Sequence, residues 1–235
     1  MGDTIYGNKF GGDNIHGDKI VTHGSPRPRR PVEPAVVLVM SAGTDQQAPL
    51  RVDEERREIS HAVRLAGAGE RIDVRTADAL RLDDLSDVLP HHRPVIAHFS
   101  GHGVAGAGIV VTDDLRQPQS VPPEALSELF RLERGRLQCV VLNACFTEDQ
   151  AWAIAEHVPF VIGMRGRVLD DTAIRFAAGF YRGIAYARSV RDAFDLGCNR
   201  LRLHGHLDAD VPRLVDRQGT PDLPVVDRPA DPDAR

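Results

Sequence analysis

The sequence predicts an α/β fold in which a mostly parallel sheet lies between two layers of helices. Short apolar runs of strand length alternate along the chain with longer segments whose apolar residues have helical spacing. The short runs are rich in Val and Ile and lack the polar alternation of a half-exposed strand, as expected where both faces of a parallel sheet are covered. Such alternation implies βαβ units with right-handed crossovers, and therefore a three-layer α/β/α sandwich.

The folded domain is expected over residues 35–204. In its first half, strands are expected at 35–40, 71–77 and 94–100. Helices are expected at 52–67, where apolar residues stand amid charges before a closing Gly, and at 82–89.

The second half continues the same alternation. A hairpin arm is expected at 108–114, strands at 137–144 and 159–164, and helices at 122–132, 148–157, 170–187 and 189–204. Three aromatic residues at helical positions, Trp152, Phe176 and Phe180, are expected to pack in the core.

Residues 1–22 carry an internal repeat of four pentads, GDTIY, GNKFG, GDNIH and GDKIV. An odd period cannot keep one face of a flat strand, so the chain is expected to turn at each Gly and to gather the four Ile and Phe side chains in short β-arcs. One copy supplies about one coil, and copies from other chains would complete the stack. A disordered Gly/Asp-rich tail is the alternative.

Two further segments lack periodicity. Residues 23–34 are rich in Pro and charge and are expected to form an extended linker. Residues 205–235, rich in Pro, Asp and Arg, are expected to be a largely disordered tail, although part of VPRLV is a candidate for packing on the domain.

Composition excludes several classes of function. The formal charge of −5 and the pI near 6.0 give no general attraction to nucleic acid. No secretion signal and no apolar run of about 20 residues is present, so a cytoplasmic protein without a membrane span is expected. The three cysteines lack CxxC spacing, which predicts neither a disulfide framework nor a zinc site.

His102 and Cys145 follow two predicted strands, in HFSGHG at 98–103 and VLNACF at 141–146. Sites of open α/β sheets lie beyond the carboxyl ends of the strands, so the two side chains are expected to meet. The helix expected after Cys145 would favour the thiolate at its N-terminus. A buried structural cysteine is the alternative. His98 and His102 give an H-x3-H pattern, but no third ligand accompanies them and no metal site is expected.

These motifs resemble those of the caspase-like cysteine peptidase clan, and within it bacterial CHAT-domain and effector-associated caspase-like proteins. The likeness covers about residues 35–204 and includes 161–194. It implies a caspase-like fold in which His102 is the general base, Cys145 the nucleophile, and the backbone N–H groups of Gly103 and Cys145 the oxyanion donors. It implies no metal and no organic cofactor.

Substrate preference has a separate signal. Some relatives in this clan have an Asp two places before the cysteine that binds a basic P1 residue, and here that residue is Asn143. Asp170 and Asp171 could bind a basic P1 side chain instead. The alternative is that Asp170 or Thr172 caps the helix that follows.

The pentad repeat resembles short bacterial amyloid-type signalling motifs that precede effector domains and also occur on NTP-driven sensor proteins. Together the two resemblances imply a cysteine endopeptidase that is activated by assembly or proximity, in prokaryotic antiviral immunity or cell death. Its partners would be a protein substrate and either the sensor or copies of the same chain. A catalytically inactive adaptor that signals through N-terminal assembly is the alternative.

Overall fold

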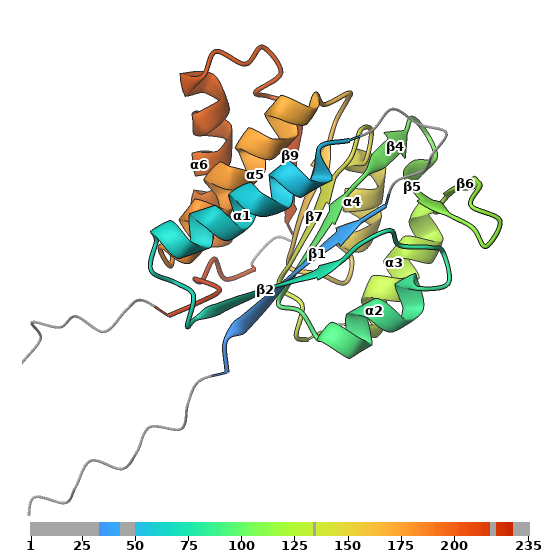
Figure 1. Ribbon diagram of the computed structural model, residues 1–235, viewed down its shortest axis with the longest axis horizontal. Coiled ribbons are helices and arrows are strands. Elements are labelled where there is room, and N and C mark those ends of the chain that lie inside the picture. Colours follow the sequence, from blue (N-terminus) through green and yellow to red (C-terminus); the bar gives the residue numbers. More distant parts are fainter. Residues whose placement is uncertain (1–32, 43–49, 134, 217–219, 228–235) are drawn as a thin grey trace, which may run out of the picture. The chain divides into compact units, whose positions relative to one another are not determined.

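The computed structural model describes residues 33–42, 50–133, 135–216 and 220–227, which form an α/β domain around a six-stranded sheet (Figure 1). The sheet has the order β2-β1-β3-β7-β8-β9. Its strands are β1 Ala35–Ser41, β2 Ile72–Ala77, β3 Ile96–Ser100, β7 Cys139–Asn143, β8 Phe160–Met164 and β9 Pro212–Asp216. All pairs are parallel except β8 with β9, which confirms the predicted mostly parallel sheet.

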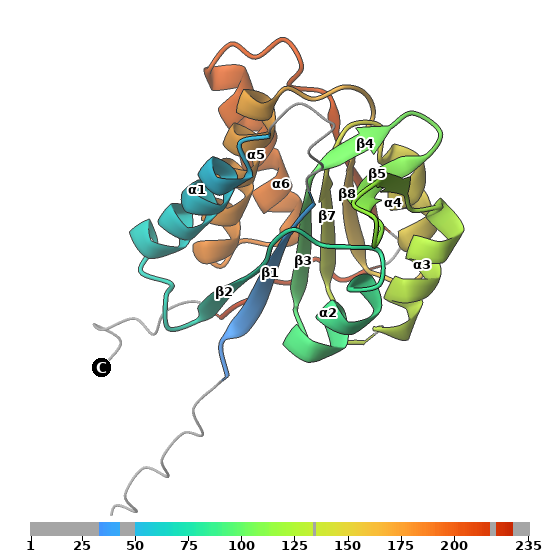
Figure 2. The ribbon, with the colours of Figure 1, turned by 45° about the vertical axis from the view of Figure 1, so that its right-hand side comes forward.

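Helices cover both faces of this sheet, as the sequence predicts (Figures 1 and 2). One face carries α1 Val52–Leu65, α5 Asp170–Ala185 and α6 Val190–Leu203. The other carries α2 Leu85–His92, α3 Pro123–Leu132 and α4 Glu148–Ile154. The fold is therefore a three-layer α/β/α sandwich, as the sequence predicts.

The central strands are buried on both faces, which explains their continuous apolar runs. In β1, Val37 and Val39 pack in the core beneath α1 and α5, whereas Leu38 and Met40 pack in the opposite core beneath α2. Successive side chains of a strand point to opposite faces, so a strand covered on both sides needs an apolar residue at every position.

A small antiparallel sheet follows β3 at the edge where the site is expected. It consists of β4 His102–Val104, β5 Gly108–Thr112 and β6 Pro118–Ser120. The buried Gln150 of α4 holds it in place, because its Oε1 accepts from the N–H of Ile109 at 2.9 Å and its Nε2 donates to the carbonyl of Val121 at 2.7 Å. The hairpin that begins with His102 is thereby fixed to the helix that follows Cys145.

Two sequence expectations are wrong in this region of the fold. The domain does not end at residue 204, because β9 within the predicted 205–235 tail pairs with β8 along its whole length and Val226 is buried. The sequence marks VPRLV in this tail only as a candidate for packing, because the strand has few apolar residues and lies among Pro and Asp. Trp152 is 58% exposed, because the residues that the short α4 buries are Gln150, Ala151 and Ile154.

The pentad repeat at 1–22 and nearly all of the linker at 23–34 lie outside the described residues. Within the described part of the chain, no helix is both long and apolar enough to cross a membrane.

Candidate active site

The pairing of β3 with β7 sets the geometry of the site. Ser100, the last residue of β3, lies in register with Asn143, the last residue of β7. His102 and Cys145 each follow two residues later, so the two side chains leave the sheet at the same level on neighbouring strands. Both are partly exposed and line one cleft.

Gly103 brings the two loops into direct backbone contact. A Cβ atom at this position would lie 1.9 Å from the carbonyl oxygen of Cys145 and 3.0 Å from its nitrogen. No side chain fits into that space, because the obstructing atoms belong to the backbone. The glycine after His102 is therefore required for the close approach of the histidine and cysteine loops.

Hydrogen bonds to neighbouring backbone groups hold the loop that carries Cys145. Phe146 has the left-handed φ of 56°, which is strained for a residue with a large side chain, and its N–H donates to the carbonyl of Gly166 at 3.1 Å. Thr147 is fully buried, and its hydroxyl donates to the carbonyl of Ala144 at 2.9 Å and accepts from the N–H of Met164 at 2.9 Å. These bonds fix the turn between β7 and α4.

The thiol of Cys145 faces the segment before α5. Its Sγ accepts from the N–H of Val168 at 3.4 Å and lies 3.7 Å from the carbonyl oxygen of the same residue. The sulfur is therefore held at the wall of the cleft by a backbone group that the sequence does not indicate.

The backbone N–H groups of Gly103 and Cys145 have distinct surroundings in the structure. Among the described residues, none accepts a hydrogen bond from the N–H of Cys145. Ile109, which faces Gly103 across β4 and β5, donates to Gln150 and accepts from Val121, so its own backbone groups point away from β4. The N–H of Gly103 then points away from β5, because facing residues of such an antiparallel pair direct these groups outward together.

A buried carboxylate lies beneath the cleft. Glu55 of α1 accepts from Nε2 of His98 at 2.9 Å and also from the Ser100 hydroxyl and the Asn143 side-chain amide. The other ring nitrogen of His98 is 3.1 Å from the hydroxyl of Tyr181 on α5. One acid thus joins α1 to the ends of β3 and β7, directly below the loops of His102 and Cys145.

These partners keep Glu55 ionised. Burial alone raises the pKa of this carboxyl, but His98, Ser100 and Asn143 outweigh burial and hold the pKa below its ordinary value. Burial also raises the pKa of Tyr181 well above its ordinary range, and the nearby Glu55 charge adds to that shift. The network therefore consists of one anion and several donors.

Asn143 has one unsatisfied atom in this network. Its Nδ2 also donates to the carbonyl of Ala173 at 3.2 Å, whereas its buried Oδ1 has no hydrogen-bond partner among the described residues. Asn143 and Glu55 both line the cleft. The floor of the cleft thus presents a carboxylate and an amide oxygen.

The two acids named as a basic-residue pocket are separated by the structure. Asp170 lines the cleft and accepts from the N–H of Arg51 at 3.2 Å. Asp171 does not line it, and its carboxylate binds Arg175 at 2.8 Å and lies 3.3 Å from His206.

Helix capping does not account for these residues. Leu169 is the N-cap residue of α5, and no side chain caps this helix. Thr172 instead donates its hydroxyl hydrogen bond to Asp208 at 2.9 Å.

The surroundings of Cys139, Cys198 and His98 indicate structural rather than catalytic roles. Cys139 and Cys198 are buried; burial raises the pKa of Cys139 strongly and that of Cys198 to about 11, so neither is an activated thiol. Both nitrogens of His98 are occupied within the Glu55 network. No group of three His, Cys, Asp or Glu side chains in the described ranges is arranged to hold a metal ion.

Sequence reasoning missed Glu55, although a signal for it exists. Glu55 shares the inward face of α1 with Ile59, Ala62 and Val63, at helical spacings of four, seven and eight residues. A carboxylate in the middle of an apolar stripe must find a partner inside the protein. This pattern could have connected α1 to the site.

Comparison with known proteins assigns the family. The family model described as "CHAT domain" matches residues 17–195. The chain belongs to the CHAT-domain family. A "Probable protease" of Gillisia limnaea is similar to this CHAT domain, with 22% identity over 134 residues, 55% of this chain; the match covers only 23% of that protein's length.

A solved structure shares the fold of this CHAT domain. It is a secreted C11 cysteine protease from Bacteroides thetaiotaomicron in complex with an irreversible peptide inhibitor, with a TM-score of 0.57 and 9% sequence identity. The likeness covers 78% of this chain and 66% of that chain. At this identity the comparison concerns the fold alone.

Glu55 should control acid stability. Because its pKa is lowered on folding from an ordinary value of 4.5, the folded state binds fewer protons, and the stabilisation present at neutral pH is lost as the pH falls through the folded pKa. We expect Glu55→Gln to lower the free energy of unfolding at pH 7 by about 3–5 kcal/mol, since it removes the anion that three buried donors share. Urea unfolding from pH 7 to about pH 3 measures both effects.

The Gln variant should also show a shallower loss of stability below about pH 5 than the wild type. Glu58→Gln, which changes a partly exposed acid on the same helix, serves as the control and should keep the wild-type slope. Equal acid slopes in the wild type and Glu55→Gln would contradict this account of the network.

Proposed function

We propose that the chain is a cysteine endopeptidase in which Cys145 is the nucleophile and His102 the general base. One observation carries the proposal: His102 and Cys145 line the same cleft, and their loops touch at a glycine whose missing side chain permits the contact. The CHAT family, the curated relative's description as a probable protease and the shared fold with a C11 cysteine protease support the same class.

The reaction follows from the two side chains. His102 takes the proton of the Cys145 thiol, and the sulfur attacks the scissile carbonyl carbon to give a tetrahedral oxyanion. The N–H groups of Gly103 and Cys145 donate to that oxyanion. The imidazolium then protonates the leaving amine, and a thioester remains on Cys145. Water, deprotonated by the same imidazole, hydrolyses the thioester and restores the thiol.

We further propose that the cleft prefers a basic P1 side chain, bound by Asp170. The carboxylate of Asp170 lies at the cleft wall, and the Glu55 anion and the unsatisfied Asn143 oxygen lie beneath it. All three favour a cation that donates hydrogen bonds. Asp171 does not line the cleft, and its carboxylate lies 2.8 Å from Arg175 and 3.3 Å from His206, whereas the guanidinium of Arg51 is 3.9 Å from Asp170.

The proposal extends to activation through the N-terminal repeat. If residues 1–22 stack between chains, or with a matching repeat on an NTP-driven sensor protein, the linker concentrates the catalytic domains around the stack. We propose that this proximity activates the peptidase as an effector of prokaryotic immunity or cell death. This proposal about activation rests on the pentad repeat and on its resemblance to bacterial signalling motifs.

Active-site labelling tests the catalytic pair. An electrophilic peptide should label wild-type Cys145, and Cys145→Ala should abolish the label. His102→Ala should slow labelling by about 10²-fold or more, because the general base is lost. Gly103→Ala should slow it by a similar factor, because its Cβ forces the two loops apart.

Mass spectrometry of the labelled protein gives the site and the rate. Gly69→Ala is a matched control, since nothing lies within 4 Å of a Cβ placed there, and it should label at the wild-type rate. An unreactive Cys145 in an assembled sample would contradict the peptidase and favour a non-catalytic adaptor.

The P1 preference separates two neighbouring acids. Asp170→Asn should lower kcat/KM for a peptide with Arg at P1 by about tenfold, as expected for a lost hydrogen bond to a charged group, and should leave a peptide with Gln at P1 unchanged. Asp171→Asn should leave both peptides unchanged. Assays of the two peptides with both variants check this, and an equal loss for Arg and Gln would refute the pocket.

The assembly step is testable on the repeat itself. A synthetic peptide of residues 1–22 should form fibres with a cross-β repeat of about 4.7 Å in X-ray diffraction. Replacement of Ile5, Phe10, Ile15 and Ile20 by Ser should prevent fibre formation, because the stacked apolar layer is lost. A peptide that stays monomeric at high concentration would argue against assembly through this segment.

A further inference from the structure

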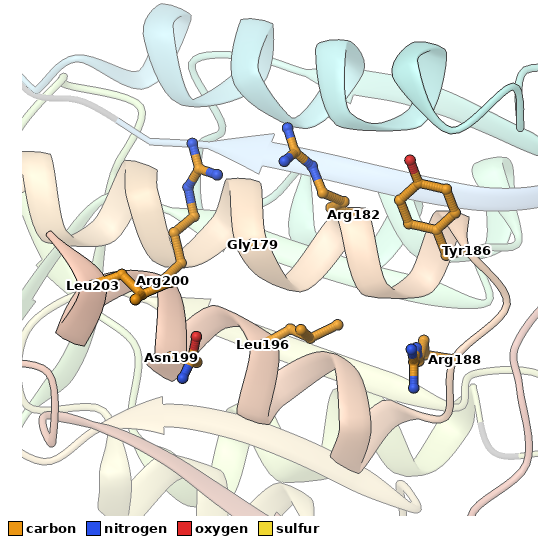
Figure 3. Close-up of a pocket in the computed structure, with 8 residues that line it drawn as sticks. All are labelled: Gly179, Arg182, Tyr186, Arg188, Leu196, Asn199, Arg200 and Leu203. Atoms are coloured by element: carbon orange, nitrogen blue, oxygen red, sulfur yellow. The ribbon is translucent and has the colours of Figure 1, made fainter.

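A second concave surface lies between α5 and α6, apart from the cleft (Figure 3). It is an open groove of about 630 Å³. The groove is lined by Gly179, Arg182, Tyr186, Arg188, Leu196, Asn199, Arg200 and Leu203. None of these residues lines the cleft of His102 and Cys145, which reaches α5 only at its N-terminal end.

The charge of this groove has one sign. It contains three arginines, and no acidic side chain is among its lining residues, although the chain as a whole carries a net charge of −5. Within the described ranges, neither Arg182 nor Arg200 has an ion-pair partner within 4.0 Å. Arg188 has one distant contact, 3.9 Å from Asp192, with both side chains largely exposed. Such an exposed pair neutralises little charge.

Arg200 is the least satisfied of the three. Its Nε is buried and has no hydrogen-bond partner among the described residues. Burial lowers the pKa of Arg200, the neighbouring charges of Arg182 and Arg175 lower it further, and Glu58 opposes these effects. Like charges and an unsatisfied buried donor both cost free energy in the unbound protein. An anion in the groove would offset the repulsion between these like charges.

Apolar side chains lie beside the arginines. Tyr186, Leu196 and Leu203 are 56%, 41% and 79% exposed. In Figure 3, Arg182, Arg200 and Tyr186 extend to the same side of α5, and Leu196 and Leu203 lie along α6. Arg and Tyr are enriched where protein interfaces gain most of their binding energy.

We propose that this groove binds an acidic, amphipathic segment of a partner protein. Carboxylates of the segment pair with Arg182 and Arg200, and its apolar side chains cover Tyr186, Leu196 and Leu203. Guanidinium groups bind carboxylates through paired N–H donors, and an amphipathic helix places acidic and apolar side chains on adjoining faces. A small phosphate compound would satisfy the arginines but leave the three apolar side chains uncovered, so the peptide fits better.

Peptide binding to the full chain tests the proposal. The probe is a fluorescein-labelled peptide of about 16 residues, some 24 Å long as a helix, with Leu at helical spacing and Glu at the adjoining positions. Fluorescence anisotropy should show saturable binding that weakens at high salt. Arg182→Glu and Arg200→Glu should each weaken binding about tenfold or more, and so should replacement of every Glu of the peptide by Gln.

A charge-matched control lies on the other side of the domain. Arg116→Glu and Arg131→Glu, in the β5–β6 turn and α3, change the net charge equally and should leave the affinity unchanged. No binding of the Glu/Leu peptide, or equal binding to the groove and control variants, would overturn the proposal. Tight binding of ATP to the groove arginines without binding of the peptide would also overturn it, in favour of a phosphate site.

Hydrogen exchange on the wild-type protein keeps the test independent of how the variants fold. The peptide should slow amide exchange within residues 179–203, and protection confined to other segments would overturn the proposal. Because the groove shares no residue with the cleft, labelling of Cys145 should be unaffected by Arg182→Glu. The outcome is therefore separate from that of the peptidase proposal.

Discussion

The register between β3 and β7 is the constraint on which the rest of the site depends. Ser100 and Asn143 are paired at the ends of these strands, and His102 and Cys145 follow at equal distances. A slip of one residue would displace one loop by about 3.3 Å and turn every side chain of that strand to the opposite face. The close fit of Gly103 on the Cys145 backbone exists only in the observed register.

Glu55 explains how this register is maintained. Its carboxylate binds Ser100 and Asn143, the two paired residues themselves, and approaches them from a third element, α1. An apolar residue would give a core of similar density, but it would not distinguish one register from the next. A buried, fully bonded anion does, because a shifted partner would leave it unsatisfied. The charge therefore contributes to specificity of the fold at the site, whatever its net contribution to stability.

Much of this arrangement could be predicted from the sequence, for identifiable reasons. Continuous Val-rich runs located the parallel strands, and topology alone brought two strand ends to one edge of the sheet. The sequence marks the edge strand β9 only as a candidate for packing, in VPRLV, because the strand is short and lies among prolines. The sequence also could not predict which of Asp170 and Asp171 lines the cleft, since neighbouring residues on a helix point about 100° apart.

The role of Glu55 depends on contacts between residues that are far apart in the sequence. Its hydrogen-bond partners lie 43 to 88 residues away in the sequence, so no local sequence pattern indicates which residues they are. The buried face of α1 showed that a partner was needed, but only the docking of α1 on the sheet chose His98, Ser100 and Asn143. The sequence alone does not predict hydrogen bonds that form where a helix and two strands meet, as α1, β3 and β7 do here.

Helix α5 belongs to two surfaces at once. Near its beginning, Asp170 and Ala173 line the cleft of His102 and Cys145. Further along, Gly179 and Arg182 line the groove between α5 and α6. A helix transmits rotation rigidly, so one residue inserted between Ile174 and Gly179 would turn everything downstream by about 100° and carry Arg182 out of the groove without moving the cleft wall. The number of residues between the two surfaces is thus as constrained as their chemistry.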